Sequence, residues 1–304
     1  MNTTVPGVSV VIPHYGDPAP TQELVTALTQ QLGAPELQII VVDDASPEPY
    51  VQVGDETTIR RAENGGFGST VNVGAAAAQR EYLLILNSDL TVGPSLIADL
   101  TRLANPLMPA VVSPEVIGHS GSSQWTGRHF PRVTHTFVNA FSGLARFRHR
   151  RWWHESVGHN TSTVMPGVHR TDWVVGAVLY LPTQSFHDVG GFDERFYMNS
   201  EEIDLQRRLG QRGVHSYVLG DLTVEHEGGG SSNPELRRTW VVTSALRFAE
   251  KWNDHPGLHR AALGAAAILN FVVNAVRQLA GRDVRSLETL RREFRYARVP
   301  ISPR

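Results

Sequence analysis

The stretch Leu83-Leu84-Ile85-Leu86-Asn87-Ser88-Asp89 decides the fold class of this 304-residue chain. Four apolar residues run into a polar triplet that finishes on a carboxylate. This pattern is typical of a buried strand with an acidic side chain at its carboxyl end, where α/β sheets bind ligands. A carboxylate there can hold a divalent cation against a phosphate. Asn-Ser-Asp is also good turn chemistry, so the triplet needs support from other segments.

Apolar runs and helical periods alternate around this stretch. They predict buried strands over residues 8–12, 37–42, 57–60 and 82–86, and helices over residues 21–32, 65–78 and 96–103. Such alternation implies a Rossmann-like α/β fold with a mostly parallel central sheet flanked by helices. Further strands are expected over residues 173–181 and 214–219, and helices over 201–213, 236–252 and 258–279. Residues 118–170 show little periodicity and are interpreted as loops and insertions over the site.

The composition excludes several classes of protein. Cysteine is absent, which rules out disulfides, thiolate metal sites and a cysteine nucleophile. The formal net charge is −2, so no global basic field indicates a nucleic-acid partner. We find no secretory signal and no uninterrupted apolar run of about 20 residues, the length of a membrane span. A cytoplasmic protein fits these observations.

Polar residues also follow the first two predicted strands. Pro13 and Tyr15 come after the first strand, and Asp43 and Asp44 end the second. In a parallel sheet both places lie at the same edge as Asp89. An aspartate there can accept hydrogen bonds from a nucleotide base or a ribose hydroxyl. The alternative is that these residues form a turn or a helix N-cap.

A glycine-rich segment, Glu63-Asn64-Gly65-Gly66-Phe67-Gly68-Ser69, lies between the second strand and the Leu83 strand. Its glycines allow a backbone to approach a ligand closely. The segment is not a phosphate-binding loop of the Gly-Lys-Ser/Thr type, and its position does not fit a dinucleotide-binding fingerprint. Asn72 follows shortly afterwards.

Three carboxylates, Glu201, Glu202 and Asp204, crowd the start of a predicted helix. The helix dipole favours them there, and one of them is also a candidate general base for an acceptor hydroxyl. Trp173 and Gly176 belong to the predicted strand before that helix. A tryptophan is usually core, whereas a glycine inside a strand often marks close approach of a ligand.

His226 is the candidate partner of Asp89 in a metal site, because a neutral imidazole can act as a ligand. It precedes the segment Glu227-Gly228-Gly229-Gly230-Ser231-Ser232, which has the composition of a mobile lid. A lone histidine is otherwise most often a surface or core residue.

Taken together and in this order, the segments resemble the family 2 glycosyltransferases of the GT-A fold, over about residues 8–252. The motifs that carry the resemblance are Val-Val-Ile-Pro-His-Tyr, Val-Val-Asp-Asp-Ala-Ser, Glu-Asn-Gly-Gly-Phe-Gly, Leu-Asn-Ser-Asp, Gly-Gly-Phe-Asp-Glu-Arg-Phe and Glu-Glu-Ile-Asp-Leu. The most similar subgroup is that of the bacterial rhamnosyltransferases of cell-wall and polysaccharide assembly.

The resemblance implies a role for each candidate residue. The implied donor-binding residues are Pro13, Tyr15, Asp43, Asp44, Asn64, Gly65, Phe67, Asn72, Asn87, Ser88 and Asp89. Asp89 and His226 would bind Mg²⁺ or Mn²⁺, Trp173 and Gly176 would lie on the acceptor side, and Glu202 would be the base, with Glu201 and Asp204 as alternatives. Two residues depart from the pattern: Asn87 replaces the first acid of the family's Asp-x-Asp motif, and Glu202 replaces an aspartate.

The implied activity is an inverting, metal-dependent hexosyl transfer, with rhamnose moving from dTDP-rhamnose to a hydroxyl of a glycan or a polyprenyl-diphosphate-linked acceptor. A UDP-sugar, such as UDP-galactofuranose or a UDP-hexose, is the alternative donor. A non-catalytic nucleotide-sugar-binding relative is a third interpretation. Nucleotidyl transfer is disfavoured, because residues 13–20 lack the glycine-rich, basic loop that this chemistry uses.

The resemblance also suggests how the chain is divided. Residues 1–252 would form the GT-A domain, with a nucleotide-binding half (1–117) and an acceptor-side half (118–252). Residues 253–304 would form a helical tail that is rich in arginine, in which Asn270, Asn274 and Arg277 make a narrow polar stripe. We expect this tail to lie as an amphipathic helix on the anionic inner face of the plasma membrane. The alternative is a helix packed on the domain or against a second subunit of a homodimer.

Overall fold

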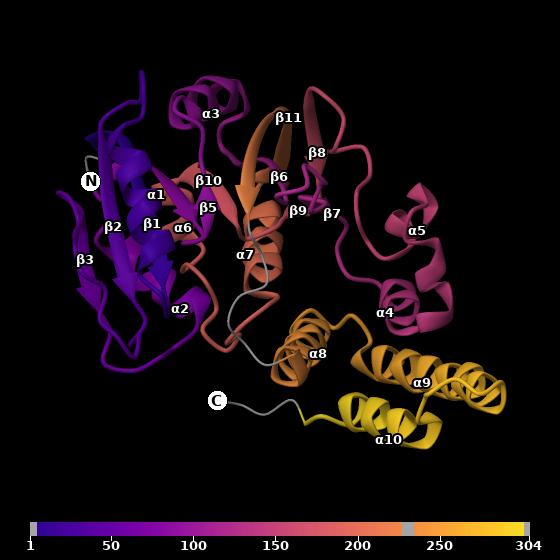
Figure 1. Ribbon diagram of the computed structural model, residues 1–304. Coiled ribbons are helices and arrows are strands. Elements are labelled where there is room, and N and C mark those ends of the chain that lie inside the picture. Colours follow the sequence, from indigo (N-terminus) through magenta and orange to yellow (C-terminus); the bar gives the residue numbers. More distant parts are fainter. Residues whose placement is uncertain (1–4, 227–233, 301–304) are drawn as a thin grey trace. The chain divides into compact units, whose positions relative to one another are not determined.

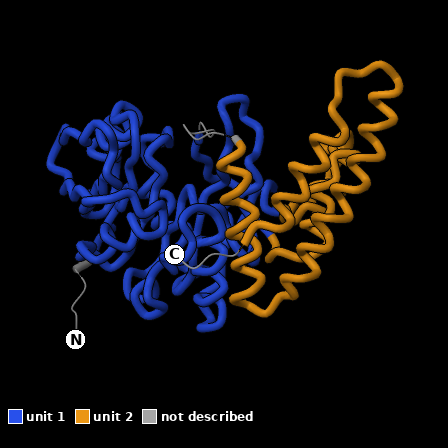
Figure 2. Tube along the Cα trace, turned by 90° about the horizontal axis from the view of Figure 1, so that it is seen from below, with its two compact units in different colours: residues 1–128, 162–231 blue, residues 129–161, 232–304 orange. Residues whose placement is uncertain are grey.

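The computed structural model describes residues 5–226 and 234–300, which fall into two compact units (Figures 1 and 2). Unit 1 is Met1–Arg128 with Ser162–Ser231, and unit 2 is His129–Thr161 with Ser232–Arg304. The units therefore do not divide at residue 252, where the sequence placed a boundary. The helices at residues 133–140 and 234–251 group with the C-terminal helices because they contact the helix at residues 256–279. The division into a nucleotide half and an acceptor half stays a prediction.

A mixed sheet organises unit 1 (Figure 1). In the part of the chain that is described, its strand order is β3-β2-β1-β4-β10-β6-β11-β5, with β8 beside β11. These strands are β1 (Val5–His14), β2 (Leu37–Asp43), β3 (Thr57–Arg60), β4 (Arg80–Leu86), β5 (Leu90–Thr91), β6 (Ala110–Ile117), β8 (Val168–Thr171), β10 (Val178–Pro182) and β11 (His215–His226). A small second sheet pairs β7 (Gly127–Arg128) with β9 (Trp173–Val174).

The first four strands are parallel, as the alternation of strands and helices predicts. β10 then runs antiparallel to both β4 and β6, and β11 is parallel to β6. The sheet is thus mixed rather than mostly parallel. The antiparallel direction of β10 has a consequence for the site, because it brings the residues just before β10 to the edge where β4 ends.

Helices cover both faces of the sheet. They are α1 (Ala19–Thr29), α2 (Phe67–Ala76), α3 (Leu96–Ala104), the short η1 (Asn105–Leu107), α6 (Thr183–Asp188) and α7 (Glu201–Gln211). Side chains alternate along β4, so Leu84 and Leu86 join the core under α1 and α3 while Leu83 and Ile85 join the core under α2, α6 and α7. The small residues of α2 let it approach the sheet: a Cβ on Gly74 would lie 2.5 Å from a methyl group of Val11.

Several predicted elements differ from the structure. The strand expected over residues 173–181 is broken at residues 175–177 into β9 and β10, and the strand expected over 214–219 continues to His226. Residues 118–170, interpreted as loops, contain β7, α4 (Val133–Ala140), η2 (Ser142–Phe147), α5 (Arg151–Ser156) and most of β8. Residues 129–161 belong to unit 2. The glycine-rich segment 227–232, interpreted as a lid, lies outside the described residues.

Unit 2 consists of α4, η2 and α5 together with α8 (Pro234–Lys251), α9 (Pro256–Leu279) and α10 (Ser286–Ala297). Two of the three residues of the predicted polar stripe of α9 face the protein. Asn270 and Asn274 are buried, and the side chain of Asn270 accepts hydrogen bonds from the Ser142 N–H and hydroxyl (2.9 and 2.7 Å) and donates to the Ala140 carbonyl (2.9 Å). The row Ile268, Leu269, Val272, Val276 and Leu279 is exposed instead.

Among the described residues, α9 is the one helix that is long and apolar enough to cross a membrane, and 22% of its most apolar window is buried. Length and composition alone make this weak evidence, since a core helix of a soluble protein meets the same criteria.

Candidate functional site

The polar triplet at the end of β4 lies in a turn between β4 and β5. Antiparallel pairing places Leu86 opposite Val178, and the Asn87 N–H donates to the Ala177 carbonyl (2.9 Å). Ser88 and Asp89 complete the turn and are half-buried. Asp89 therefore projects from a tightly paired strand end. A backbone held on both sides limits how far its carboxylate can move.

His226, the last residue of β11, faces this turn. Its Nε2 atom lies 3.1 Å from Asp89 Oδ1 and 3.2 Å from the Asn87 side-chain nitrogen. Pairing of β11 with β5, with His226 opposite Leu90, brings the histidine to the turn. The sequence prediction that Asp89 and His226 share one site thus corresponds to a direct contact, although they lie 137 positions apart in the sequence.

Gln124 fixes which nitrogen of His226 carries the proton. Its amide NH₂ donates to the His226 carbonyl (2.8 Å), so its amide oxygen must face the His226 ring. That oxygen lies 3.0 Å from Nδ1 and accepts a hydrogen bond from it. In the neutral ring the Nε2 lone pair therefore points at Asn87 and Asp89. An outer carboxamide of this kind orients a ligating histidine in many metal sites.

The Asp89–His226 pair fits a hard divalent cation that is shared with a phosphate group. A carboxylate oxygen and an imidazole lone pair converge at 3.1 Å. Burial raises the pKa of Asp89, but when the imidazole is protonated its Nε2–H donates to Asp89, and this hydrogen bond and positive charge hold the pKa below its ordinary value. In the neutral ring the same nitrogen carries the lone pair that a cation can take. Among the described residues, no three or more His, Asp or Glu side chains are arranged so that they could hold a metal ion together. Mg²⁺ is commonly held by one or two carboxylates together with substrate phosphates and water, so two protein ligands are sufficient.

Asp43 and Asp44 at the end of β2 are occupied by the protein itself. Asp44 accepts hydrogen bonds from the N–H groups of Gly65 and Gly66 (both 2.9 Å) and forms an ion pair with Arg61 (2.6 Å). Asp43 accepts from the N–H groups of Ser46 and Tyr50 and pairs with Arg60. The turn interpretation thus describes both side chains. Asp44 shapes the glycine-rich loop, and direct contact with a nucleotide stays a prediction.

The other predicted nucleotide residues surround the same edge. Pro13 is half-buried near the end of β1, and the ring of Tyr15 just beyond it is 53% exposed, free to pack on a flat ligand. Asn64 accepts a hydrogen bond from the Tyr197 hydroxyl (2.8 Å). Phe67 begins α2 and packs edge-on against Phe192 at 5.7 Å between ring centres. Asn64 and Phe67 thereby connect the glycine-rich loop to the 190–197 segment.

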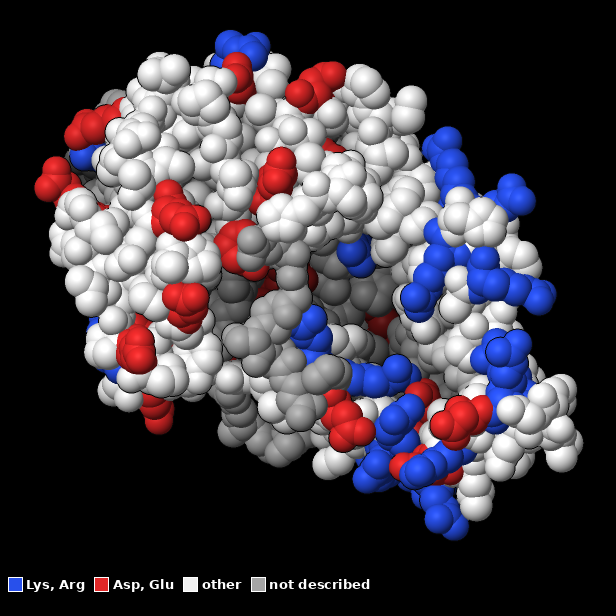
Figure 3. Space-filling model, in the orientation of Figure 1, with Lys and Arg blue, Asp and Glu red and all other residues white. Residues whose placement is uncertain are grey.

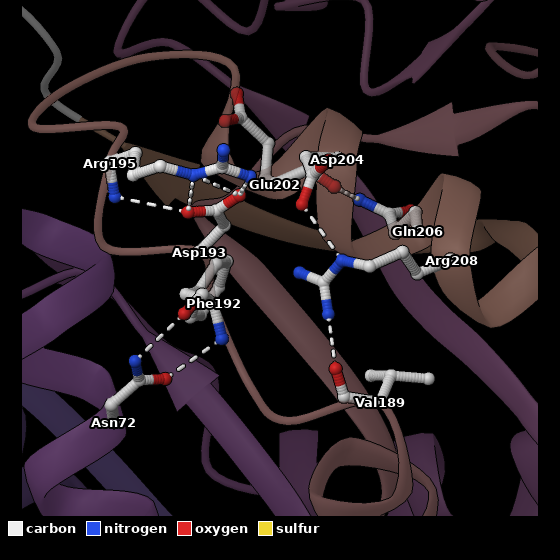
Figure 4. A network of polar contacts seen from close by, with 9 residues as sticks. All are labelled: Asn72, Val189, Phe192, Asp193, Arg195, Glu202, Asp204, Gln206 and Arg208. Atoms are coloured by element: carbon white, nitrogen blue, oxygen red, sulfur yellow. Dashed lines mark hydrogen bonds and ion pairs between the residues drawn. The ribbon is translucent and has the colours of Figure 1, made fainter. Parts of the chain in front are cut away.

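Asn72 holds the Gly-Gly-Phe-Asp-Glu-Arg-Phe segment in place (Figure 4). Its side chain accepts from the Phe192 N–H (2.8 Å) and donates to the Phe192 carbonyl (2.9 Å), the pattern of a neighbouring strand. Asn72 was predicted to bind the donor, and its described contacts are with the loop. Figure 4 shows Arg195 folded back on Asp193, with 2.6 Å between Nη2 and Oδ2.

Gly176 lies between the Asp89–His226 pair and the predicted base, Glu202. A Cβ on Gly176 would lie 3.6 Å from the Glu202 Cβ and 3.7 Å from the Phe67 ring, while the next residue, Ala177, bonds Asn87. Trp173 is buried on the neighbouring β9. Residues 176–177 thus lie between the Asp89–His226 pair and Glu202. Residues 176–177 take this position because the chain leaves β9 and has not yet entered β10 there.

The three carboxylates at the start of α7 have different surroundings. Asp204 is fully buried and pairs with Arg208 (2.8 Å), so it is unsuited to reach an acceptor. Glu201 is buried, and burial together with the charge of Glu202 raises its pKa well above the ordinary value. Burial also raises the pKa of Glu202, but the charge of Arg128 opposes the shift. In Figure 4 the Glu202 side chain extends away from the Asp204–Arg208 pair.

Three residues of the candidate site were not predicted from the sequence: Glu115, Gln124 and Arg128. Glu115 lies on β6, which was not predicted, and the other two lie in the stretch that was interpreted as loops. The buried apolar run Ala110-Val111-Val112 could have revealed β6. Nothing in the local pattern marks Gln124 or Arg128, because their roles depend on strands that are distant in sequence.

Comparisons with known proteins agree with this geometry. Residues 9–170, more than half of the chain, match the model of glycosyl transferase family 2. The chain belongs to glycosyltransferase family 2.

One relative in this family is an N-acetylglucosaminyl-diphospho-decaprenol L-rhamnosyltransferase from Mycobacterium tuberculosis, which is 25% identical over 244 residues (75% of this chain and 78% of the relative). The predicted likeness to bacterial rhamnosyltransferases is thereby confirmed.

Solved structures confirm the GT-A fold. A mannosyltransferase from Pyrobaculum calidifontis, PcManGT in complex with GDP-Man and Mn²⁺, superposes with a TM-score of 0.56 at 14% identity, over 97% of this chain and 87% of that one. GalNAc-T7, solved with UDP, GalNAc and Mn²⁺, gives a TM-score of 0.56 at 14% identity. The match covers 80% of this chain, which spans only 47% of the GalNAc-T7 chain.

Proposed function

We propose that the protein transfers a sugar, with inversion, from a nucleoside-diphosphate donor to a hydroxyl of a glycan or a polyprenyl-diphosphate-linked acceptor. The observation that carries this proposal is the arrangement around residues 176–177. The Ala177 carbonyl accepts a hydrogen bond from the N–H of Asn87, whose side chain contacts His226, and Gly176 lies beside Glu202. A cation-binding pair and a candidate base thus flank one point, as transfer from a diphosphate to a hydroxyl requires.

Each residue has a defined task in this proposal. Asp89 and His226 would hold Mg²⁺ or Mn²⁺, which neutralises charge on the leaving diphosphate. Glu202 accepts the proton of the acceptor hydroxyl as its oxygen forms the new bond to the anomeric carbon. Gly176 leaves room beside Glu202 for that hydroxyl. Because attack and departure occur on opposite faces of the sugar, no covalent intermediate on the protein is needed.

We propose rhamnose, carried by dTDP, as the sugar. Support comes from the rhamnosyltransferase of Mycobacterium tuberculosis, whose name states an N-acetylglucosaminyl-diphospho-decaprenol acceptor. The role would then lie in assembly of cell-wall or surface polysaccharide. UDP in the GalNAc-T7 structure keeps a UDP-sugar as the competing donor.

The charge distribution supports a peripheral position on the inner face of the plasma membrane. Unit 2 holds 18 Lys and Arg against 7 Asp and Glu, formally +11, which leaves −13 for unit 1 within the net charge of −2. Figure 3 shows basic side chains gathered over the helices of unit 2. A lipid-linked acceptor lies at such a surface, and basic segments bind anionic lipid. A homodimer that covers the exposed row of α9 is the competing arrangement.

The first experiment is a thermal-shift screen with dTDP, UDP and their sugars, with and without Mn²⁺ or Mg²⁺. A ligand that binds only the folded state increases the free energy of unfolding and so raises the melting temperature. At a ligand concentration of 100 times Kd the increase is about 2.7 kcal/mol. We expect metal-dependent stabilisation by dTDP, followed by release of dTDP from dTDP-rhamnose when acceptor is added. Stabilisation by UDP alone would redirect the assay to UDP-sugars. The absence of any nucleotide-dependent shift would contradict the proposal.

A further inference from the structure

Arg128, on β7, is held in a fixed orientation next to the candidate base. Its Nε–H donates to the Trp125 carbonyl (3.0 Å) and its Nη2–H donates to the Gln124 carbonyl (3.2 Å). Its guanidinium lies 5.7 Å from the centre of the Trp173 ring. The Nη1 group takes part in neither hydrogen bond. Two carbonyls and an aromatic face therefore orient the cation without neutralising its charge.

The architecture links this cation to α7. Arg128 pairs with Trp173 across the β7–β9 ladder, and β9 is joined to α7 by Gln206. Gln206 accepts from the Val174 N–H (2.8 Å) and donates both to the Val174 carbonyl (2.8 Å) and to the Glu202 carbonyl (3.1 Å). β7, β9 and the first turn of α7 thus form one hydrogen-bonded unit. Movement of Arg128 relative to Glu202 would break several of these bonds.

The charges around Glu202 affect the pKa values of Glu202 and Glu201 differently. Burial lowers the pKa of Arg128 to about 10, and the negative charges of Glu202 and Glu115 oppose that shift, so Arg128 remains a cation at neutral pH. Conversely, Arg128 lowers the pKa of Glu202 against the effect of burial. Glu201 carries no comparable help from a cation, and the charge of Glu202 raises its pKa further.

The remaining charged groups near this point largely act on one another. Asp204 pairs with Arg208, and Asp193 pairs with Arg195. Glu115 accepts a hydrogen bond from the Ser123 hydroxyl and faces Arg128. The charged groups to consider are therefore Glu201, Asp204, Arg207 and Arg208 on α7, Asp193 and Arg195 before it, Arg128 on β7 and Glu115 on β6.

We infer that Arg128 is a positioning residue that keeps the Glu202 carboxylate, rather than Glu201, charged and ready to accept the proton of the acceptor hydroxyl. This inference rests on the proposed function. Residues 124–128 then have two roles. Gln124 orients the ring of His226, and the positive charge of Arg128 favours the ionised form of Glu202. The segment would coordinate the donor side and the acceptor side of the site.

The test is the pH dependence of kcat/KM for transfer by the full chain, which reports on groups of the free enzyme. Wild type is compared with Arg128→Gln, Arg128→Lys and the control Arg102→Gln, whose side chain is 66% exposed on α3. We expect Arg128→Gln to move the acidic limb upward by on the order of one pH unit, since a nearby opposite charge shifts a carboxyl by about that amount or more. Arg128→Lys should restore much of the wild-type limb, and Arg102→Gln should leave it unchanged.

A loss that is equal at every pH in Arg128→Gln, with an unmoved limb, would show that the residue is only structural and would overturn the inference. If Arg128→Gln does not fold, Arg128→Lys decides: its positive charge should keep the limb near that of wild type, and a limb displaced by a full unit would contradict us. Wild-type protein that transfers no sugar from any donor would refute the proposed function instead. The two failures are therefore distinguishable.

Discussion

Glu201 and Glu202 are adjacent in sequence and chemically identical, yet the fold surrounds them with different charges. Both are pushed toward the neutral form by burial, but Arg128 favours the ionised form of Glu202. The general rule is that two carboxyls whose surroundings separate their pKa values divide the acid and base roles between them. Applied to this pair, the rule supports our proposal that Glu202, which the family resemblance also indicates, is the base.

Glu202→Gln should abolish proton acceptance while it preserves the shape of the side chain. We expect kcat to fall by roughly 10²- to 10⁴-fold, the usual contribution of a general base. The activity of the matched variant Glu201→Gln should fall much less, because Glu201 is not the proposed base and no cation opposes the rise of its pKa. Nucleotide-dependent thermal shifts should persist in both variants. Equal losses of activity in the two variants would contradict the assignment.

Asp89→Ala should remove one of the two protein ligands of the cation. We expect the metal-dependent part of the nucleotide thermal shift to disappear, because the remaining His226 offers a single neutral ligand. Asp99→Ala is the matched control, since Asp99 lies on α3, pairs with Arg102 and is half-exposed. Isothermal titration of Mn²⁺ in the presence of dTDP measures the same loss directly. Unchanged metal affinity in Asp89→Ala would sink the proposed site.

Glu201 should also make stability depend on pH. The folded chain binds the Glu201 proton more tightly than the unfolded chain does, because burial raises its pKa above 4.5. This contribution to stability is complete below the unfolded pKa and is lost as pH rises through the folded pKa. Urea unfolding at pH 5 and pH 8 should therefore show a smaller pH-dependent loss for Glu201→Gln than for wild type. A larger loss would reverse the sign of the argument.

At the scale of elements, the polar ends of buried strands were predictable because they depend on local pattern. The apolar run before Asp89, the glycine-rich loop and the start of α7 all occur where the sequence placed them. β6 was missed because Ser113, Pro114 and Glu115 interrupt its apolar run. The antiparallel direction of β10 was missed because strand direction follows from tertiary pairing, which no local period records.

The polar stripe of α9 illustrates the same limit. The sequence left open whether this helix lies on a membrane or packs against protein, and polar side chains can face inward when each finds a partner. Asn270 finds its partners in η2 and α4, elements that lie in the stretch expected to be irregular. Without those helices the sequence offered no reason to bury an asparagine. The membrane contact stays a proposal, and the exposed apolar row of α9 is the face that it would use.

Asn270→Ala should destabilise unit 2. It leaves the Ser142 N–H and the Ala140 carbonyl without their side-chain partner, at a cost of about 1–3 kcal/mol. Val272→Ala on the same helix is the control: Val272 is 53% exposed, so we expect a change within about 0.5 kcal/mol. Chemical unfolding measures both. A difference below the error of the method would indicate that the Asn270 contacts contribute nothing.

At the scale of the whole molecule, charge is sorted between the two units. Unit 1 binds a metal–nucleotide complex in our proposal and is acidic, whereas unit 2 is basic and exposes apolar side chains on α9. Such a combination of arginines and apolar surface favours an anionic bilayer over water, at about 1 kcal/mol for each basic residue near the surface. It also explains why a net charge of −2 says little about either unit.

The full chain should sediment with phosphatidylglycerol vesicles and much less with phosphatidylcholine vesicles, and salt should weaken the binding. Val272→Asn/Val276→Asn should reduce it, because both side chains are exposed on α9. Leu32→Asn/Val51→Asn removes exposed apolar side chains from unit 1 instead and should have no effect. Vesicle binding that is identical in the two double variants would exclude α9. A shift from dimer to monomer in the α9 variant would identify a second copy as the occupant.

The carboxamides of Asn72 and Gln206 each bond both the N–H and the carbonyl of one backbone residue, Phe192 and Val174. Each therefore shields an amide proton that would otherwise exchange with deuterium from the solvent. The exchange rate of the Val174 proton reports how often the joint between β9 and α7 opens, and that of Phe192 reports on the loop before α7. Comparison of the two rates with and without nucleotide would separate local opening near Glu202 from release of the loop, without any measurement of turnover.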